Sequence, residues 1–377
     1  MKIIYCICSL YNPGGMERVL LNKVRYLKEK MGWDVSVVTT DQHGRPTFYP
    51  FPEGVRIIDL GINYTDDNGK SPILKTLGYL RRRRKHRKAL TELLFKERPD
   101  IVDSLYPSES SFIPAIQDGS RKVLELHFNR FFRLQYRRHG LLGLSDRLRS
   151  RQDERIVRKF DSFVVLTEED KGYWGNLPNI EAIPNAANIA EATLSDCSAH
   201  RVIAVGRLDY QKGFDRLIEA WSIIKREPGY SDWQLDIFGQ GEWKEMLENM
   251  IVDKGLTGSA RINKPTNEIW KEYSCSSLIV MTSHFEGFGM VLVEAMLQGV
   301  PAVAFDCKCG PKDIIDNGKN GLLAPEGDVP ALAEAMMKIM SDDSLRRRMG
   351  EEALKIKEKY SEEKVMERWI QLFNQLM

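Results

Sequence analysis

The sequence predicts an α/β protein built from two doubly wound parallel sheets. Short runs rich in Ile and Val alternate with helical patterns over nearly the whole chain, which is typical of strands covered by helices. At 377 residues the chain is long enough for two domains. A small, polar and non-periodic segment at residues 189–200 is the expected linker. It separates a domain at 1–188 from a domain at 201–360, which a terminal helix at 361–377 follows.

The first domain begins with an apolar strand followed by a regular helical pattern. That helix is predicted to start near Gly15, so its N-terminus points past the end of the first strand. Its buried face would consist of Val19, Leu20, Val24 and Leu27. The strands predicted here are residues 2–8, 34–39, 55–59, 100–102, 122–126 and 162–166, with helices between them.

The second domain repeats this alternation. In open parallel sheets ligands bind beyond the carboxyl ends of the strands, so two such domains facing each other would enclose a cleft. The terminal helix has an apolar stripe of Val365, Trp369, Leu372 and Leu376 that can dock on a neighbouring surface. The predicted strands are 201–205, 234–238, 277–282 and 302–305, and the helices are 214–225, 243–254, 290–298 and 329–340.

The composition excludes several classes of protein. With 42% hydrophobic and 29% charged residues the chain can bury a large core, which rules out a disordered segment, a coiled coil or a disulfide-stapled small domain. No apolar run approaches the roughly 18 residues of a membrane-spanning helix. The six cysteines include no C-x-x-C pair and no histidine at metal-ligand spacing, so we expect reduced thiols, no metal site and a cytosolic location.

Charge is unevenly distributed although the net formal charge is only +2. Residues 1–190 have 32 Lys and Arg against 23 Asp and Glu, which gives +9, whereas the remaining residues sum to −7. The excess lies in one band, because residues 70–160 alone sum to +13. We expect an anionic ligand or surface to meet that band.

Two glutamates separated by seven residues give the clearest chemical signal. Glu294 lies in the stretch MVLVEAMLQ, which is apolar nearly all round and therefore predicts a buried helix. A carboxylate there costs several kcal/mol unless it is paired or bound to a hydroxyl-rich ligand. Glu286 precedes this helix, and Gly287 and Gly289 would let backbone N–H groups approach a diphosphate. A carboxylate merely favoured at a helix N-terminus explains Glu286 equally well.

A second signal is the segment AVGRLDYQKGFDRLIEAW at 204–221, where a strand leads through a loop into a helix. Arg207 and Lys212 stand beside the helix N-terminus, where the helix dipole disfavours cations, so a phosphate would offset their charge. Two solvated basic residues are the commoner explanation for such a loop.

Two further features lie at predicted strand ends in the first domain. Gly14 and Gly15 in PGGMER remove side chains where the backbone would approach a ligand, although a simple turn also explains a glycine pair. His127 follows the strand at 122–126, at the carboxyl edge of the first sheet, and an isolated histidine is more often structural.

Two common nucleotide-binding motifs are incomplete or missing. FGQGEW at 238–243 does not become G-x-G-x-x-G, since Lys244 occupies the place of the third glycine, and this disfavours a nicotinamide dehydrogenase. No G-x-x-x-x-G-K-S/T is present, so a P-loop kinase or ATPase is not supported.

In their order along the chain, these segments resemble family 4 of the retaining glycosyltransferases, whose two Rossmann-like domains form the GT-B fold around a central cleft. Each motif is weak alone, whereas the set is specific. The resemblance also implies that the terminal helix returns to the N-terminal domain. It rests on PGGMER, IPNAAN before the linker, GRLDYQKGFDRLIEA, FGQGEW, the spacing of Glu286 and Glu294, GPKDII at 310–315 and NGLLAP at 320–325.

The resemblance implies a role for each candidate residue. Arg207 and Lys212 would hold the donor diphosphate and Glu294 the ribose hydroxyls. Glu286 would contact the donor sugar, and His127 would lie beside the sugar and the acceptor. The segment RINKP departs from the family pattern because it lacks the usual glycine. Further contacts to the nucleotide sugar are expected from Gly14, Gly15, Gly239, Asn263, Lys264, Pro265, Phe288, Gly289, Met290, Val291 and Leu292.

The implied reaction is glycosyl transfer with retention at the anomeric carbon, through an oxocarbenium-like state in which negative charge grows on the leaving diphosphate. Arg207, Lys212 and the helix N-terminus at 289–292 would oppose that charge. No D-x-D element is present, so neither a metal nor another cofactor is expected. The leaving phosphate would take the proton of the acceptor hydroxyl, and a carboxylate pair at glycosidase separation is then not required.

The basic band suits a membrane-associated acceptor. Residues 74–95 and 128–151 mix cations with leucines and aromatics, and such a surface fits an anionic membrane or a polyprenyl diphosphate. A solvated helix face explains the pattern nearly as well. The densest run consists of Arg81, Arg82, Arg83, Arg84, Lys85, Arg87 and Lys88.

We therefore expect an enzyme that moves a sugar from a nucleotide diphosphate sugar, expected to be a UDP-sugar, to a saccharide or lipid-linked acceptor. The glycan would be a capsule, lipopolysaccharide or similar surface polymer. The enzyme would act in the cytoplasm, at the inner face of the membrane, without a nucleic-acid partner. Two alternatives remain: a same-fold sugar-nucleotide epimerase, which needs no acceptor, and a non-catalytic nucleic-acid-binding protein using residues 81–88, which the acidic second half disfavours.

Overall fold

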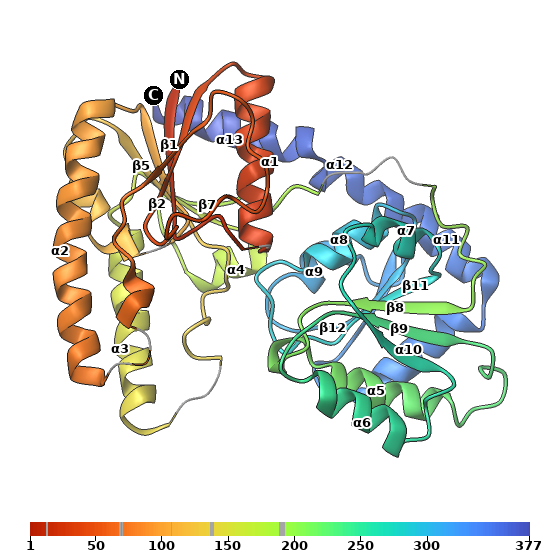
Figure 1. Cartoon of the computed structure of the whole chain (residues 1–377). Coiled ribbons are helices and arrows are strands. Elements are labelled where there is room, and N and C mark those ends of the chain that lie inside the picture. Colours follow the sequence, from red (N-terminus) through yellow and green to blue (C-terminus); the bar gives the residue numbers. More distant parts are fainter. Residues whose placement is uncertain (13, 68, 70, 107, 136–138, 188–192) are drawn as a thin grey trace. The chain divides into compact units, whose positions relative to one another are not determined.

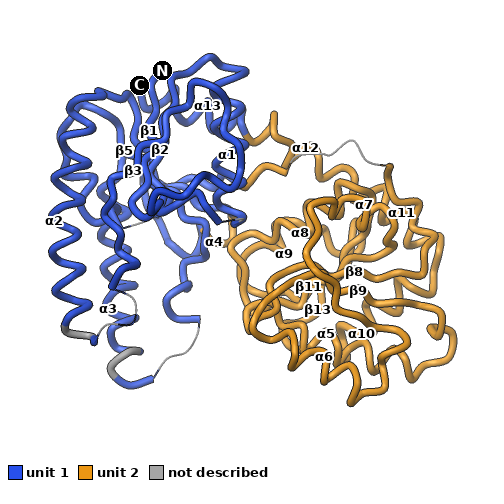
Figure 2. Tube along the Cα trace, viewed as in Figure 1, with its two compact units in different colours: residues 1–166, 171–183, 366–377 blue, residues 167–170, 184–365 orange. Residues whose placement is uncertain are grey.

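The fold is described from a computed structural model of the chain. The structure describes all residues except 13, 68, 70, 107, 136–138 and 188–192, so part of the predicted linker lies outside the described residues. Two compact units are present (Figure 2). Unit 1 comprises residues 1–166, 171–183 and 366–377, and unit 2 comprises residues 167–170 and 184–365. None of the described helices is long and apolar enough to cross a lipid bilayer.

Unit 1 is built on a seven-stranded parallel sheet with the strand order β3-β2-β1-β4-β5-β6-β7 (Figure 1). Its strands are β1 (Lys2–Ile7), β2 (Asp34–Thr39), β3 (Arg56–Asp59), β4 (Ile101–Ser104), β5 (Arg121–Glu125), β6 (Ser162–Val165) and β7 (Ile180–Ala182). Its helical elements are α1 (Gly15–Glu29), η1 (Tyr64–Asp67), α2 (Pro72–Glu97), η2 (Ser108–Ser111), η3 (Ile113–Ala115), α3 (Gly140–Val157), the second half of α4 (Glu168–Tyr173) and most of α13 (Glu362–Leu376).

Alternation along the central strands assigns each side chain to one face of this sheet. Tyr5 of β1 lies on the face covered by α1, because the Lys23 ammonium of that helix is 5.6 Å from the Tyr5 ring centroid. The terminal helix α13 covers the same face, since the Trp369 ring centroid is 3.4 Å from Lys23 Nζ. The opposite face packs against α2 and α3 in a core cluster that includes Ile4, Cys6, Leu90, Leu94 and Val157.

Helix α2 is much longer than the strands that it connects. Its 26 residues rise about 39 Å, whereas the four residues of β3 span about 13 Å. The C-terminal half of α2 buries Leu90 and Leu94 in the core. The first turns therefore extend past the carboxyl edge of the sheet, as Figure 1 shows, and Leu74 and Leu77 are 58% and 59% exposed there.

Unit 2 contains a six-stranded parallel sheet with the order β10-β9-β8-β11-β12-β13 and a core centred on Trp221 and Trp233. Its strands are β8 (Arg201–Val205), β9 (Gln234–Phe238), β10 (Ala260–Asn263), β11 (Leu278–Met281), β12 (Ala302–Phe305) and β13 (Gly321–Ala324). Its helical elements are η4 (Tyr210–Lys212), α5 (Phe214–Ile224), α6 (Lys244–Asp253), α7 (Ile269–Ser274), α8 (Met290–Met296), α9 (Pro311–Ile314), α10 (Val329–Met340), α11 (Asp343–Ala353), η5 (Leu354–Ile356) and α12 (Lys357–Tyr360).

The predicted fold class is confirmed, and the listed strands and helices are present with ends within two residues of those expected. The segment around Ala260 is a strand as well. Strands β7 and β13 were not predicted as strands, because three residues with a central Glu and four residues that begin with Gly are too short to show a pattern.

Candidate functional site

In unit 2, Lys212 and Glu286 form an ion pair at the carboxyl edge of the sheet. Lys212 ends η4, after β8, and Glu286 lies in the loop after β11. Strands β8 and β11 are adjacent and parallel, so their following loops meet at the same edge. Lys212 Nζ lies 2.6 Å from Glu286 Oε1, which also accepts a 2.6 Å hydrogen bond from the Ser283 hydroxyl. The two charged side chains are only 16% and 6% exposed, so water screens their attraction weakly.

Glycines let these strand-end loops approach each other closely. Gly213 has a φ of 59°, and a Cβ there would lie 2.4 Å from the carbonyl oxygen of Thr282. The Thr282 hydroxyl in turn donates a 3.0 Å hydrogen bond to the carbonyl of Lys212. A Cβ at Gly239 would lie 2.0 Å from the carbonyl oxygen of Gly206, so Gly239 is needed for packing between the loops after β8 and β9.

Glu294 lies on α8 and is half-buried. The helix itself is largely buried, as its composition predicted, through Leu292, Val293, Ala295 and Met296. Residues three and four apart share a helix face, and on this face Met290, Val291 and Glu294 are all half-exposed. The Tyr273 hydroxyl donates a 3.4 Å hydrogen bond to Glu294 Oε2. The carboxylate therefore reaches the open side of an otherwise buried helix.

Arg207 and Lys212 differ in their environments although they belong to one loop. The Arg207 side chain is 67% exposed, donates a 2.8 Å hydrogen bond to Gln211 and lies 3.4 Å from Asp209. The anion expected beside the two cations is therefore supplied at Lys212 by Glu286 and at Arg207 by Asp209. Gln211 also donates a 3.2 Å hydrogen bond to the Phe285 carbonyl, which ties the loops after β8 and β11 together.

Most side chains at the turn into α8 are buried. The Phe288 ring is buried and lies 5.3 Å from the Tyr360 ring, measured between centroids. Gly289 caps α8 with a φ of 101°, a conformation that other residues rarely adopt. Buried Leu292 also points its side chain into the core. Among the predicted contacts at 288–292, only Met290 and Val291 have partly exposed side chains.

The loop after β10 combines one engaged side chain with two exposed residues. Asn263 donates a 3.1 Å hydrogen bond to Asp236, whose carboxylate also lies 2.5 Å from Arg201 Nε. The Asn263 amide therefore stabilises a fully buried carboxylate through a hydrogen bond, and the Arg201 guanidinium neutralises its charge. Lys264 and Pro265 are exposed.

In unit 1, Gly14 and Gly15 begin α1, and they serve different needs. A Cβ at Gly14 would lie 2.0 Å from Glu17 Oε2, so the cap requires a glycine or a shift of that side chain. No atom of the described residues lies within 4 Å of a Cβ at Gly15, which leaves space beside the first turn of the helix.

His127 is held by a buried carboxylate. Its Nε2 lies 3.2 Å from Glu125 Oε2, and Glu125 Oε1 accepts a 2.5 Å hydrogen bond from Lys23 Nζ. The Lys23 ammonium also lies against the Trp369 ring of α13. The side chains of Lys23, Glu125 and His127 are 4%, 2% and 6% exposed. The imidazole is therefore fixed by a chain of contacts from β5 through α1 to the terminal helix.

Opposite pKa shifts show how charge is distributed in this cluster. Burial alone would raise the pKa of Glu125, but Lys23 and His127 outweigh it and lower that pKa to about 2. Burial and the neighbouring Glu125 carboxylate raise the pKa of Asp103 well above its usual value. The cluster thus favours an ionised Glu125 beside a protonated Asp103.

Comparisons with known proteins identify the family. Residues 13–191 match the model described as Glycosyltransferase Family 4, and residues 187–356 match the model described as Glycosyl transferases group 1. The chain belongs to glycosyltransferase family 4. Its fold and motif order agree with this assignment, and the family resemblance drawn from the sequence is confirmed.

This glycosyltransferase is similar over its full length to the amylovoran biosynthesis glycosyltransferase AmsD of Erwinia amylovora, with 28% identity over 391 residues and 99% of each chain covered. An exopolysaccharide phosphotransferase of Streptomyces coelicolor is 35% identical over 223 residues, but the match spans 58% of this chain and 24% of that protein. The structure of TarM of S. aureus superimposes with a TM-score of 0.78 at 19% identity, covering 99% and 100% of the two chains, which supports the shared fold.

Several residues of the two candidate sites were not predicted from the sequence. Lys23, Asp103 and Glu125 escaped notice, although charged residues within the apolar stretches IVDS and KVLE were a signal that could have been used. No such signal marked Ser283 and Tyr273, whose hydroxyls donate hydrogen bonds to Glu286 and Glu294. Hydroxyl side chains occur in every kind of environment, so their positions in the sequence indicate nothing. Among the described residues, no cluster of three or more His, Cys, Asp or Glu is placed to hold a metal ion.

Two of the seven predicted cations of α2 turn inward. The Arg82 guanidinium binds Asp67, with distances of 3.1 and 3.3 Å, and Arg83 Nε donates a 3.2 Å hydrogen bond to Ser111. The sequence predicted one exposed surface of seven cations, but Arg82 and Arg83 do not belong to it. The exposed members are Arg81, Arg84, Lys85, Arg87 and Lys88.

Replacing Lys23 with Met is expected to lower the free energy of unfolding by about 3–5 kcal/mol at pH 7, because Glu125 is left as an uncompensated buried charge. The double variant Lys23→Met/Glu125→Gln should recover much of this loss. Urea unfolding at pH 7 measures both, and additive losses in the double variant would contradict a direct pair.

The same pair has a defined pH dependence. Since the pKa of Glu125 is lower in the folded state than in the unfolded state, its stabilisation is present above about pH 4.3 and is lost as the pH falls toward 2. Glu125→Gln should remove this part of the acid sensitivity in urea titrations between pH 5 and pH 2.5.

Proposed function

We propose that the enzyme transfers a glycosyl group from a UDP-sugar, with retention at the anomeric carbon, to a saccharide acceptor of a cell-surface glycan. The enclosed pair of Lys212 and Glu286 at the carboxyl edge of unit 2 is the observation that most supports a donor site there. The TarM structure was obtained with UDP and alpha-GlcNAc-glycerol, and the AmsD relative is named for amylovoran biosynthesis. These names agree with a UDP-sugar donor and a surface polysaccharide product.

Charge compensation would be the main task of the cations. Negative charge grows on the diphosphate as the sugar leaves, and a buried ammonium opposes that charge more strongly than one in water. Lys212 is enclosed, whereas exposed Arg207 can reach an incoming diphosphate without leaving a buried partner. No cofactor is needed for this chemistry, because the two cations would serve where a metal ion serves in other phosphate-leaving reactions.

Glu286 would have two tasks. In the free enzyme it neutralises Lys212, and the Ser283 hydroxyl fixes its carboxylate. When a diphosphate binds Lys212, the second oxygen, Oε2, would accept a hydrogen bond from a sugar hydroxyl. Glu294, on the open side of α8, would accept hydrogen bonds from the ribose hydroxyls, with Tyr273 holding one carboxylate oxygen.

Glu294→Ala is expected to weaken UDP binding by well over tenfold, because two hydroxyl hydrogen bonds to a charged acceptor are lost. Isothermal titration calorimetry with UDP measures this change. Glu334, exposed on α10, is a control for the loss of a helical carboxylate, and Glu334→Ala should bind UDP like the parent. Unchanged UDP affinity in Glu294→Ala would remove the ribose assignment.

Lys212→Gln is expected to reduce kcat by about 10²–10³, the effect of removing one charge-stabilising group in a preorganised site. Lys244→Gln on exposed α6 removes the same charge outside the site and should retain the parent rate. Thermal unfolding of each variant separates loss of fold from loss of rate.

Release of UDP from UDP-sugars, measured with and without acceptor, distinguishes a transferase from the alternative epimerase, which needs no acceptor.

We further propose that the projecting turns of unit 1 contact an anionic membrane. Leucines that would otherwise remain in water lie close to exposed cations, a pattern typical of interfacial helices. Leu74, Leu77 and Leu80 of α2 are 58%, 59% and 48% exposed, and Leu144 and Leu148 of α3 are 54% and 57% exposed.

The triple variant Arg84→Ser/Arg87→Ser/Lys88→Ser tests this contact. Each cation contributes on the order of 1 kcal/mol near an anionic surface, so the partition coefficient onto phosphatidylglycerol vesicles should fall by about 10². Co-sedimentation measures the partition, with phosphatidylcholine vesicles as the uncharged control. Equal binding of parent and variant would leave these residues as ordinary surface.

A further inference from the structure

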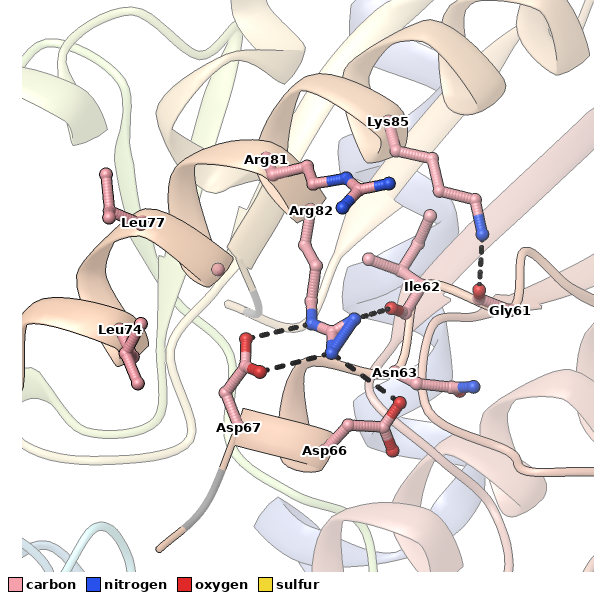
Figure 3. A pocket seen from close by; sticks show the side chains of 11 residues that line it. Gly61, Ile62, Asn63, Asp66, Asp67, Leu74, Leu77, Arg81, Arg82 and Lys85 are labelled. Carbon is pink, nitrogen blue, oxygen red and sulfur yellow. Dashed lines mark hydrogen bonds and ion pairs between the residues drawn. The ribbon is translucent and has the colours of Figure 1, made fainter. Parts of the chain in front are cut away.

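A hollow of about 740 Å³ lies in unit 1 between the first turns of α2 and the segment that follows β3. Figure 3 shows α2 forming one wall, and the loop with η1 forming the other. The hollow lies at the carboxyl edge of the sheet, because Ile62 and Asn63 donate hydrogen bonds to the carbonyl of Thr40, directly after β2. This is the edge at which parallel sheets bind ligands, and α1 also begins there.

The wall formed by α2 changes character along its length. Its lining residues recur at helical spacing, so they form one stripe along the helix. The stripe starts with Leu74 and Leu77 and ends with Arg81 and Lys85. Gly78 lies between the two parts, where a Cβ would come within 2.1 Å of Asp67 Oδ2, so this glycine keeps the floor of the hollow close to the helix. The hollow is therefore apolar at one end and cationic at the other.

The charges around the hollow are not equally engaged. Arg82 is held by Asp67 and lies 3.6 Å from Asp66, and Lys85 donates a 2.8 Å hydrogen bond to the Gly61 carbonyl. Arg81 makes no hydrogen bond or ion pair with any part of the chain that the structure describes. A second anion entering the hollow would therefore find Arg81 available and Lys85 beside it, whereas Arg82 is already neutralised.

We propose that this hollow binds the phosphate end of an amphiphilic acceptor, an isoprenoid phosphate. The phosphate would contact Arg81 and Lys85, and the first isoprene units would cover Leu74 and Leu77. Apolar surface and unpaired charge lie on one stripe, so a free phosphate would leave the leucines exposed and a neutral lipid would leave Arg81 unpaired. The role as an acceptor rests on the proposed transferase function, whereas the binding itself does not.

The test is direct binding of geranyl phosphate, a ten-carbon isoprenoid monophosphate, to the full chain in the presence of excess UDP, which occupies the donor site. Calorimetry compares the parent with Arg81→Gln, Leu77→Ser and Arg87→Gln. Arg87 is the matched control, since it is exposed on the same helix but does not line the hollow. We expect Arg81→Gln and Leu77→Ser each to weaken binding at least tenfold and Arg87→Gln to leave it unchanged.

Three outcomes would overturn the proposal. Equal weakening by Arg81→Gln and Arg87→Gln would indicate that binding depends on the overall positive charge of α2 and not on the hollow. Binding of inorganic phosphate as tightly as geranyl phosphate would indicate a phosphate site without a lipid. Binding of phosphatidylglycerol vesicles that depends on Arg81, without binding of geranyl phosphate, would assign the hollow to a membrane headgroup. Transfer activity is measured separately, so a negative binding result leaves the proposed donor chemistry intact.

Discussion

Parallel pairing of the strands is the constraint on which both candidate sites depend. It brings the loops after β8 and β11 to one edge of the sheet of unit 2, although more than seventy residues separate Lys212 from Glu286 along the chain. In unit 1 the same constraint places the start of α1 and His127 at one edge. The chemistry of each unit is therefore assembled by topology from residues that are individually unremarkable on their loops.

Buried charge is stabilised in the two units by the same means. In unit 2 the Lys212 ammonium and the Glu286 carboxylate neutralise each other, and the Ser283 hydroxyl donates a hydrogen bond to the same carboxylate oxygen. In unit 1 an ionised Glu125 lies between Lys23 and His127. A buried pair of this kind contributes little net stability, but its geometry is tightly defined, because separating the partners leaves a charge without compensation. A site that stabilises a developing charge needs charged groups held in such fixed positions.

Helix α2 shows how length alone can create a surface. A helix that only crossed the sheet would need about ten residues to match a 13 Å strand, yet α2 has 26. The surplus turns cannot pack on the sheet, so their leucines remain exposed and the stripe from Leu74 to Lys85 borders a hollow. Membrane contact and binding of an amphiphilic acceptor would use the same projecting turns. Leu74 and Leu77 belong to both, whereas the cations differ: Arg84, Arg87 and Lys88 for the membrane, Arg81 and Lys85 for the acceptor.

The sequence by itself determined the fold class, because the alternation of apolar runs and helical patterns depends on local periodicity, and motif order identified the family. It also pointed to Lys212, Glu286 and Glu294 as residues of interest. Only the tertiary structure decided that Lys212 and Glu286 form a pair, that Glu294 faces the open side of α8, and that Arg82 is neutralised by Asp67. Contacts between distant segments depend on strand order and helix rotation, which local patterns do not contain. For the same reason the support of His127 by Glu125, Lys23 and Trp369 could not be predicted before three elements were brought together.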